Sequence, residues 1–163
     1  MARITVGIGG LAAARDGDAL VTHALGSCVG ICLYEKNLKL GAMAHAFLPD
    51  SGMMSRTSEP ADEGGRYVDT AVRNLLAAME ACGAERKNIT ARLYGGARMF
   101  PMGHTSFVGD ACDIGSRNCE AAREALAACG IHIAEEDLGG TSARTIVFRT
   151  DDGSVSVNEN RRG

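Results

Sequence analysis

The segment Val21–Glu35 has the sequence VTHALGSCVGICLYE, and it decides how this chain is expected to fold. It contains a tight corner at Gly26–Ser27, after which strand-forming apolar residues recur at every second position from Val29 to Leu33. A period of two predicts a β-strand with one buried face. When a strand begins directly after such a corner, one side chain lies at the start of the strand, and here it is that of Cys28.

A second apolar run, Leu40–Phe47, follows this strand after a short turn at Lys36–Lys39. Two strands joined by so short a connection pair in an antiparallel arrangement. The pairing would bring Cys28 and His45 to the same end of a sheet. Because the thiolate is the nucleophilic form of cysteine, a reactive Cys28 needs a base beside it, and His45 is the candidate.

Thr22 precedes Cys28 by six residues, and the pattern leaves two interpretations of it open. A β-branched residue before a corner is commonly just a strand residue. Alternatively, its hydroxyl or backbone carbonyl accepts a hydrogen bond from Nδ1 of His45, which would fix the tautomer as the third member of a catalytic triad does. His23 should point to the opposite face of the strand, although it is the rival base for Cys28. Cys32 lies inside the apolar strand and is interpreted as a core residue.

The composition favours a single domain over residues 1–163 and argues against several classes of partner. A net charge of −3, the absence of tryptophan and an aromatic content of 4% offer nucleic acid neither a basic surface nor a stacking platform. No apolar run approaches the roughly 20 residues that span a bilayer, so we expect no membrane insertion. The N-terminus lacks the layout of a signal peptide, which predicts a cytoplasmic protein.

The six cysteines do not suggest a disulfide framework or a metal site. A reducing compartment disfavours disulfides, and no C-x-x-C pair supports a zinc site. Cys28 and Cys32 would lie about 13 Å apart on a strand, too far to share one ion. The glycine-rich run Gly7–Gly10 lacks the third glycine of a dinucleotide-binding loop, so it is interpreted as a strand end and turn. We therefore expect neither a metal ion nor an organic cofactor.

Two helices and about eight strands are predicted along the chain, and their order favours an α+β fold over a doubly wound one. The fold class is thus α+β, layered, with a mostly antiparallel or mixed β-sheet and two main α-helices.

Several local features are also expected along the chain. Residues 12–19 are expected to hold a turn, and Cys82 is placed on the buried stripe of the first helix. A mobile loop over residues 50–65 forms either the rim or lid of a site or an ordinary surface loop. The C-terminal tail is expected to be flexible. The helices are predicted at 66–82 and 116–129, and the strands outside the central pair at 3–8, 89–94, 131–135, 144–149 and 153–158.

The central residues resemble a known family. The pattern Thr22-x-x-Leu-Gly-Ser-Cys28-Val, followed by Gly41-Ala-Met-Ala-His45-Ala-Phe-Leu-Pro49, is similar to the active-site pattern of CheD, the chemoreceptor glutamine deamidase of bacterial and archaeal chemotaxis. It departs from that pattern at His23-Ala24, where a Leu-Gly or similar pair is expected, but the spacing from Thr22 to Cys28 is intact. The resemblance continues in order through Arg66–Ala71, Tyr94–Phe100, Gly115–Asn118, Asp137–Gly140, Arg144 and Phe148.

This resemblance implies a cysteine-hydrolase-like protein in which Cys28 is the nucleophile, His45 the general base and acid, and Thr22 the residue that orients His45. Backbone N–H groups at Gly26 and Ser27 would support the oxyanion. The implied substrates are glutamine side chains on the cytoplasmic helices of chemoreceptors, which would become glutamate with release of ammonia. Methyl-glutamate esters are a second candidate substrate, because they also present an acyl carbon.

A different class of function stays open beside the deamidase. The resemblance also implies a partner, the CheC-type phosphatase of the response regulator, so the chain could act as a regulatory binding module. Binding to that partner should survive a change at Cys28 that abolishes hydrolysis. A metal-binding Cys/His domain is a third interpretation, and it would require stoichiometric zinc.

Overall fold

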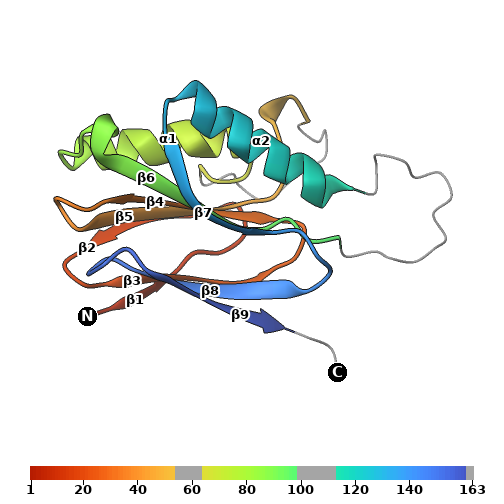
Figure 1. Ribbon diagram of the computed structural model, residues 1–163, viewed down its shortest axis with the longest axis horizontal. Coiled ribbons are helices and arrows are strands. Elements are labelled where there is room, and N and C mark those ends of the chain that lie inside the picture. The colour runs from red at the N-terminus through yellow and green to blue at the C-terminus, as the bar shows by residue number, and fades with distance from the viewer. Residues whose placement is uncertain (54–63, 99–112, 161–163) are drawn as a thin grey trace, which may run out of the picture.

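The computed structural model describes residues 1–53, 64–98 and 113–160, which form three layers (Figure 1). Two helices, α1 (Val68–Ala81) and α2 (Ile114–Ala128), cover one face of a five-stranded sheet. A four-stranded sheet packs on the other face of that sheet. The expected α+β layered fold with two main helices is therefore confirmed.

The five-stranded sheet has the order β2-β5-β4-β6-β7, and only its β6–β7 pair is parallel. The connection between those two strands crosses over through α2, as a parallel pair requires. Its strands are β2 (Leu11–Arg15), β4 (Val29–Glu35), β5 (Leu40–Ala46), β6 (Ile89–Gly95) and β7 (His132–Leu138).

The four-stranded sheet has the order β1-β3-β8-β9, and its β1–β3 pair is parallel. The predicted final hairpin is confirmed as β8 and β9, with β9 starting and ending two residues later than expected. Its strands are β1 (Arg3–Thr5), β3 (Ala19–Leu25), β8 (Ala143–Arg149) and β9 (Val155–Asn160), and short 3-10 helices occur at Ser51–Met53 and Arg86–Asn88.

The predicted pairing of the two central strands is also confirmed. β4 and β5 run antiparallel from the pair Val29–Ala46 to the pair Glu35–Leu40. β4 is the middle strand of its sheet, bonded to β5 on one side and β6 on the other. Because its two faces contact different layers, alternate side chains of β4 enter two separate cores.

One core lies between the helices and the five-stranded sheet, and the other lies between the two sheets. Ile31 and Leu33 belong to the first, and Cys28 and Cys32 to the second. The helices contribute to the first core through the stripe predicted from their period, including Leu75 of α1. Cys28 therefore faces the space between the sheets, at the end where β4 begins.

One strand was missed and one expectation was wrong. The turn expected within residues 12–19 is confirmed at Asp16–Gly17, but strand β2, which overlaps the start of this segment, was not predicted. Three alanines give β2 little strand propensity of its own, and it forms because it pairs with β5. Cys82 is exposed rather than buried, because α1 ends at Ala81 and Cys82 already has the non-helical backbone of a cap.

Most of the predicted 50–65 loop, residues 54–63, lies outside the described part of the chain, as do residues 161–163 of the tail. At the start of that loop, Ser51 bonds the carboxylate of Asp69 in α1 through its backbone N–H (3.0 Å) and its hydroxyl (3.2 Å). Within the described ranges, neither helix has the length and apolar character needed to cross a membrane.

Candidate active site

Thr22 of β3 and His45 of β5 meet between the two sheets, and both are buried. Thr22 Oγ1 lies 2.6 Å from the carbonyl oxygen of Val6 and 2.7 Å from Nδ1 of His45. A hydroxyl has one proton and a carbonyl can only accept, so Thr22 donates to Val6 and accepts from Nδ1–H. Neutral His45 is therefore held as the Nδ1–H tautomer, and its Nε2 carries a lone pair.

A β-bulge in β3 allows Thr22 to reach His45. In a regular strand, residues three apart face opposite ways, yet Thr22 and Leu25 both point into the space between the sheets. The register of β3 against β8 shifts between these two residues. Ala24, inside the bulge, has φ of 54°, and its N–H donates to Thr145 Oγ1 at 3.1 Å. His23 is exposed on the outer side, as expected, and so does not enter the site.

Cys28 lies on the same face of the five-stranded sheet as His45. Gly30 pairs directly with His45, and Cys28 precedes Gly30 by two residues, so the Cys28 and His45 side chains are diagonal neighbours. Cys28 is 8% exposed. Nε2 of His45 is buried and has no hydrogen-bond partner within the described residues, so no hydrogen bond joins it to the Cys28 thiol.

Burial keeps both groups neutral near pH 7. It raises the pKa of the Cys28 thiol to about 11, an effect that the residue's own backbone N–H partly counteracts. Burial lowers the pKa of His45 to about 4. The resting site therefore holds a thiol and a neutral imidazole rather than an ion pair, and the imidazole is in the state needed to accept a proton.

The corner at Gly26–Cys28 is held by hydrogen bonds to three successive carbonyl oxygens. The backbone N–H of Ala97 donates to Gly26 (2.8 Å), and the backbone N–H of Gly96 donates to Cys28 (2.8 Å). Between them, the side-chain amide of Asn118 donates to the Ser27 carbonyl at 2.9 Å. The corner that carries Cys28 is thus fixed by two segments far from it in the sequence.

The double glycine at Gly95–Gly96 lets these segments approach so closely. A Cβ atom on Gly95 would lie 2.2 Å from the Cys28 carbonyl oxygen, and one on Gly96 would lie 2.2 Å from Cys119 Sγ of α2. Both glycines also have positive φ, at 108° and 63°. The absence of side chains at this glycine pair therefore allows the Gly26–Cys28 corner to pack on one side of it and α2 on the other.

The backbone of His45 is fixed by the turn that was weighed as a dinucleotide loop. Gly9 donates to the His45 carbonyl (2.9 Å), and the His45 N–H donates to the Gly10 carbonyl (3.2 Å). A turn at Ile8–Gly9 leads directly into β2 rather than into a helix. Gly7–Gly10 is therefore a turn, as expected, and it supports the histidine.

Two contributors to the site were not identified from the sequence: the Val6 carbonyl and Asn118. A backbone carbonyl has no sequence signal. Asn118 lies in the Gly115–Asn118 part of the family pattern, and a buried amide on the apolar face of α2 was the signal available. Its hydrogen bonds to Ser27 and Phe47 join residues on both sides of the candidate dyad.

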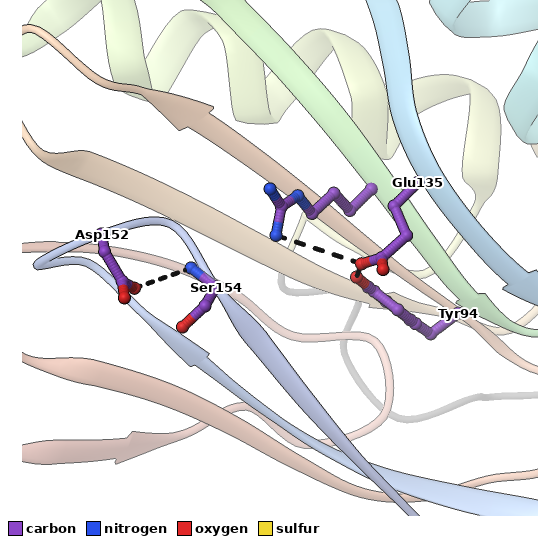
Figure 2. Close-up of polar contacts among 5 residues, drawn as sticks. Tyr94, Glu135, Asp152 and Ser154 are labelled. Carbon is purple, nitrogen blue, oxygen red and sulfur yellow. Dashed lines mark hydrogen bonds and ion pairs between the residues drawn. The ribbon is translucent and has the colours of Figure 1, made fainter.

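Tyr94 of β6 lies in the same row of the sheet as His45, since both pair with Gly30. Figure 2 shows that its hydroxyl meets the carboxylate of Glu135 on β7. Burial, helped by this hydrogen bond, raises the pKa of Tyr94. Its proton is therefore committed to Glu135, and Tyr94 is not a second base for Cys28.

In the described part of the chain, no three or more His, Cys, Asp or Glu side chains are grouped so that they could hold a metal ion. The arrangement instead contains a thiol, a neutral imidazole with a free Nε2, and a hydroxyl that fixes its tautomer. Such a set can perform nucleophilic acyl transfer with general acid–base assistance.

Comparison with known proteins places this chain in a family. The family model described as "CheD chemotactic sensory transduction" matches residues 47–159. A protein of Archaeoglobus fulgidus named "Probable chemoreceptor glutamine deamidase CheD" is 44% identical over 160 residues, which are 98% of this chain and 95% of that protein. Proteins with the same name from Symbiobacterium thermophilum (42% over 159 residues, 97% and 93%) and Clostridium novyi (40% over 154 residues, 94% and 91%) match similarly. The chain therefore belongs to the CheD family.

Proposed function

We propose that this protein is a protein-glutamine deamidase that converts glutamine side chains of chemoreceptors to glutamate. Its relatives over nearly the whole length carry the name of that activity. The hydrogen bond from His45 Nδ1 to Thr22 is the observation that carries the proposed mechanism. It leaves the basic Nε2 of His45 on the face of the sheet where Cys28 lies.

In the first half-reaction, His45 Nε2 takes the Cys28 proton while the sulfur attacks the δ-carbon of the glutamine. Because both groups are neutral at rest, proton transfer accompanies the attack instead of preceding it. Substrate binding must bring the thiol and Nε2 into contact, a tightening that is common when an enzyme binds its substrate. The tetrahedral intermediate then loses ammonia, which takes its proton from His45, and a thioester to Cys28 remains.

In the second half-reaction, His45 accepts a proton from water, and the resulting hydroxide attacks the thioester carbon. The carbon–sulfur bond breaks, glutamate is released, and the proton returns to Cys28. Thr22 keeps Nε2 available as the acceptor in both steps. Backbone N–H groups at the Gly26–Ser27 corner stabilise the oxyanion, and the proposed chemistry uses no metal ion or organic cofactor.

The proposed substrate lies on the cytoplasmic helices of chemoreceptors, so the reaction would occur in the cytoplasm. Methyl-glutamate esters on the same helices fit the same mechanism, because methanol can leave where ammonia does. The product carboxylate adds a negative charge to the receptor helix, which alters its interactions with charges one turn away.

Mass spectrometry of a chemoreceptor cytoplasmic fragment tests the proposal. The fragment is incubated with the wild-type protein or with the variants Cys28→Ala, His45→Ala and Cys32→Ala. Amide-to-acid conversion at defined glutamines should require Cys28 and His45. Cys32→Ala is the matched control, since Cys32 is a buried thiol in the same core, four residues further along the chain.

The same samples, with a methyl-esterified fragment added, report whether esters are hydrolysed. Conversion that persists in Cys28→Ala would refute the mechanism. No conversion of any cognate receptor, together with retained binding to a CheC-type phosphatase, would favour the regulatory binding module instead.

A further inference from the structure

Asn118 is a fully buried polar residue on the face of α2 that packs on the sheet. Its Nδ2 donates to the carbonyl oxygens of Ser27 (2.9 Å) and Phe47 (3.2 Å), so both amide protons are used. The start of α2 is held tightly in place, because a Cβ on Gly115 would lie 2.5 Å from the Ala97 carbonyl oxygen. Helix α2 therefore holds Asn118 in a fixed position against the Gly26–Cys28 corner.

The hydrogen bond to Ser27 also determines the direction of the next N–H group. In a trans peptide the C=O and N–H bonds point in opposite directions, and the described chain contains no cis peptide. A fixed Ser27 carbonyl therefore fixes the N–H of Cys28 on the opposite side of that peptide. Backbone N–H groups hold the neighbouring carbonyls, those of Gly26 and Cys28. Of the three successive carbonyls, that of Ser27 is the one held by a side chain, Asn118.

The backbone N–H of Cys28 can stabilise a negative charge that develops close to the Cys28 sulfur. Cys28 precedes Val29, the first residue of β4 that pairs with either neighbouring strand. The backbone nitrogen and Sγ of one cysteine are only three bonds apart, and this N–H partly offsets the rise that burial causes in the pKa of the thiol. An oxyanion on the carbon bonded to Sγ would form within its reach.

We propose that Asn118 is a positioning residue that holds the Ser27 carbonyl so that the Cys28 backbone N–H is directed at the oxyanion. This inference rests on the proposed acyl-transfer chemistry of Cys28. It differs from a purely structural role, in which Asn118 only stabilises the fold. It also differs from a role through Phe47, in which Asn118 would position His45 and thereby affect every reaction of the thiol.

Two reactions of Cys28 separate these roles. Acylation by p-nitrophenyl acetate passes through an oxyanion, whereas alkylation by iodoacetamide displaces iodide and forms none. Both require the same deprotonation by His45. Each rate is measured at Cys28 by peptide mapping with mass spectrometry, with Cys28→Ala as the blank, so neither measurement depends on a receptor substrate.

In Asn118→Leu, which keeps a branched side chain of similar shape but has no donor, acylation of Cys28 should slow by about 10- to 100-fold, part of the effect of losing an oxyanion donor. Alkylation should stay near the wild-type rate. Thr150→Val is the matched control, because it removes a buried side-chain hydrogen bond to a carbonyl (Asp18, 2.7 Å). This bond lies beyond the end of β8 that pairs with Ala19, whereas the other end of β8 pairs with Leu25 next to the Cys28 corner. It should leave both rates unchanged.

Asn118→Ala provides a second variant if the leucine variant does not fold, and folding is checked by thermal unfolding. An equal fall in both rates, or no fall in acylation, would overturn the inference. If the selective loss of acylation is found but the wild-type protein deamidates no receptor, the role of Asn118 stands and the proposed substrate fails.

Discussion

At the scale of single residues, the direction of one hydroxyl proton decides the state of the candidate base. Thr22 has two neighbours within hydrogen-bond distance, and only one of them, His45, can donate. The Val6 carbonyl therefore determines, through Thr22, which nitrogen of His45 stays unprotonated. A carbonyl remote from the reacting atoms thus controls the proposed chemistry.

Replacing Thr22 by valine keeps the shape of the side chain but leaves the Nδ1–H of His45 and the Val6 carbonyl without their shared partner. We expect kcat for deamidation to fall by about 10- to 100-fold, since the tautomer is no longer held for base catalysis. Thr22→Ser keeps the hydroxyl and should stay close to the wild-type rate. Equal loss in both variants would contradict the role of the hydroxyl.

At the scale of elements, the bulge in β3 and the glycine pair after β6 place the site. The bulge changes which way the strand faces between Thr22 and Leu25, so that both residues reach the space between the sheets. The glycine pair allows β6, α2 and the Cys28 corner to pack against each other. Both the bulge and the glycine pair use positive φ angles, which are unfavourable for residues other than glycine.

Ala24 has a left-handed backbone that costs an L-residue about 1 kcal/mol or more. Ala24→Gly should therefore raise the free energy of unfolding by about 0.5–1 kcal/mol after the greater freedom of glycine in the unfolded chain is counted. Ala143→Gly on the paired strand β8, where φ is not positive, should lower it by a similar amount. Urea unfolding measures both, and destabilisation by Ala24→Gly would contradict the strain.

Gly96→Ala combines a disfavoured φ with a clash against Cys119, whereas Gly130→Ala has a similar positive φ and nothing within 4 Å of the new Cβ. We expect Gly130→Ala to cost about 1–2 kcal/mol of stability and Gly96→Ala about 1–3 kcal/mol more. Adding Cys119→Ala to Gly96→Ala should recover part of the difference in a double-mutant cycle by urea unfolding. Equal costs at both glycines would argue against the close approach.

At the scale of the whole molecule, the candidate base lies between two stacked sheets, so its charge state is coupled to folding. Protonated His45 would be a cation between the layers beside a hydroxyl that already uses its proton for Val6. Burial consequently lowers the pKa of His45 from the ordinary 6.5 to about 4. Stability and catalysis both depend on this imidazole staying neutral.

Between about pH 6.5 and about pH 4 the unfolded chain binds a proton at His45 that the folded protein does not, so the free energy of unfolding should fall as the pH falls through this window. The loss should approach roughly 3 kcal/mol at the lower end and vanish above the upper end. Urea unfolding across this range should show a smaller loss in His45→Gln, whose side chain stays neutral. The same pH dependence in both proteins would exclude His45 as its source.

Some of this organisation follows from local patterns in the sequence. Alternating apolar residues predict β4 and β5, and the short turn between them predicts their antiparallel pairing, which brings Cys28 and His45 to one end of the sheet. The 3.6-residue stripe of Val68–Met79 predicts α1 and its buried face. Each of these signals spans only a few residues, so it can be recognised without knowing what the segment will pack against.

Other features were decided only by the tertiary structure. Strand β2 forms although its alanines do not favour it, because β5 offers an unpaired edge. Asn118 bonds Ser27 across 91 residues and Phe47 across 71 residues of sequence. The tautomer of His45 depends on the Val6 carbonyl, which has no sequence signal. The sequence by itself therefore determined the α+β class, the two main helices and the antiparallel pairing of β4 with β5. Long-range packing decided that the strands form two stacked sheets and how Cys28 and His45 are oriented, because hydrogen bonds between distant segments leave no local periodicity.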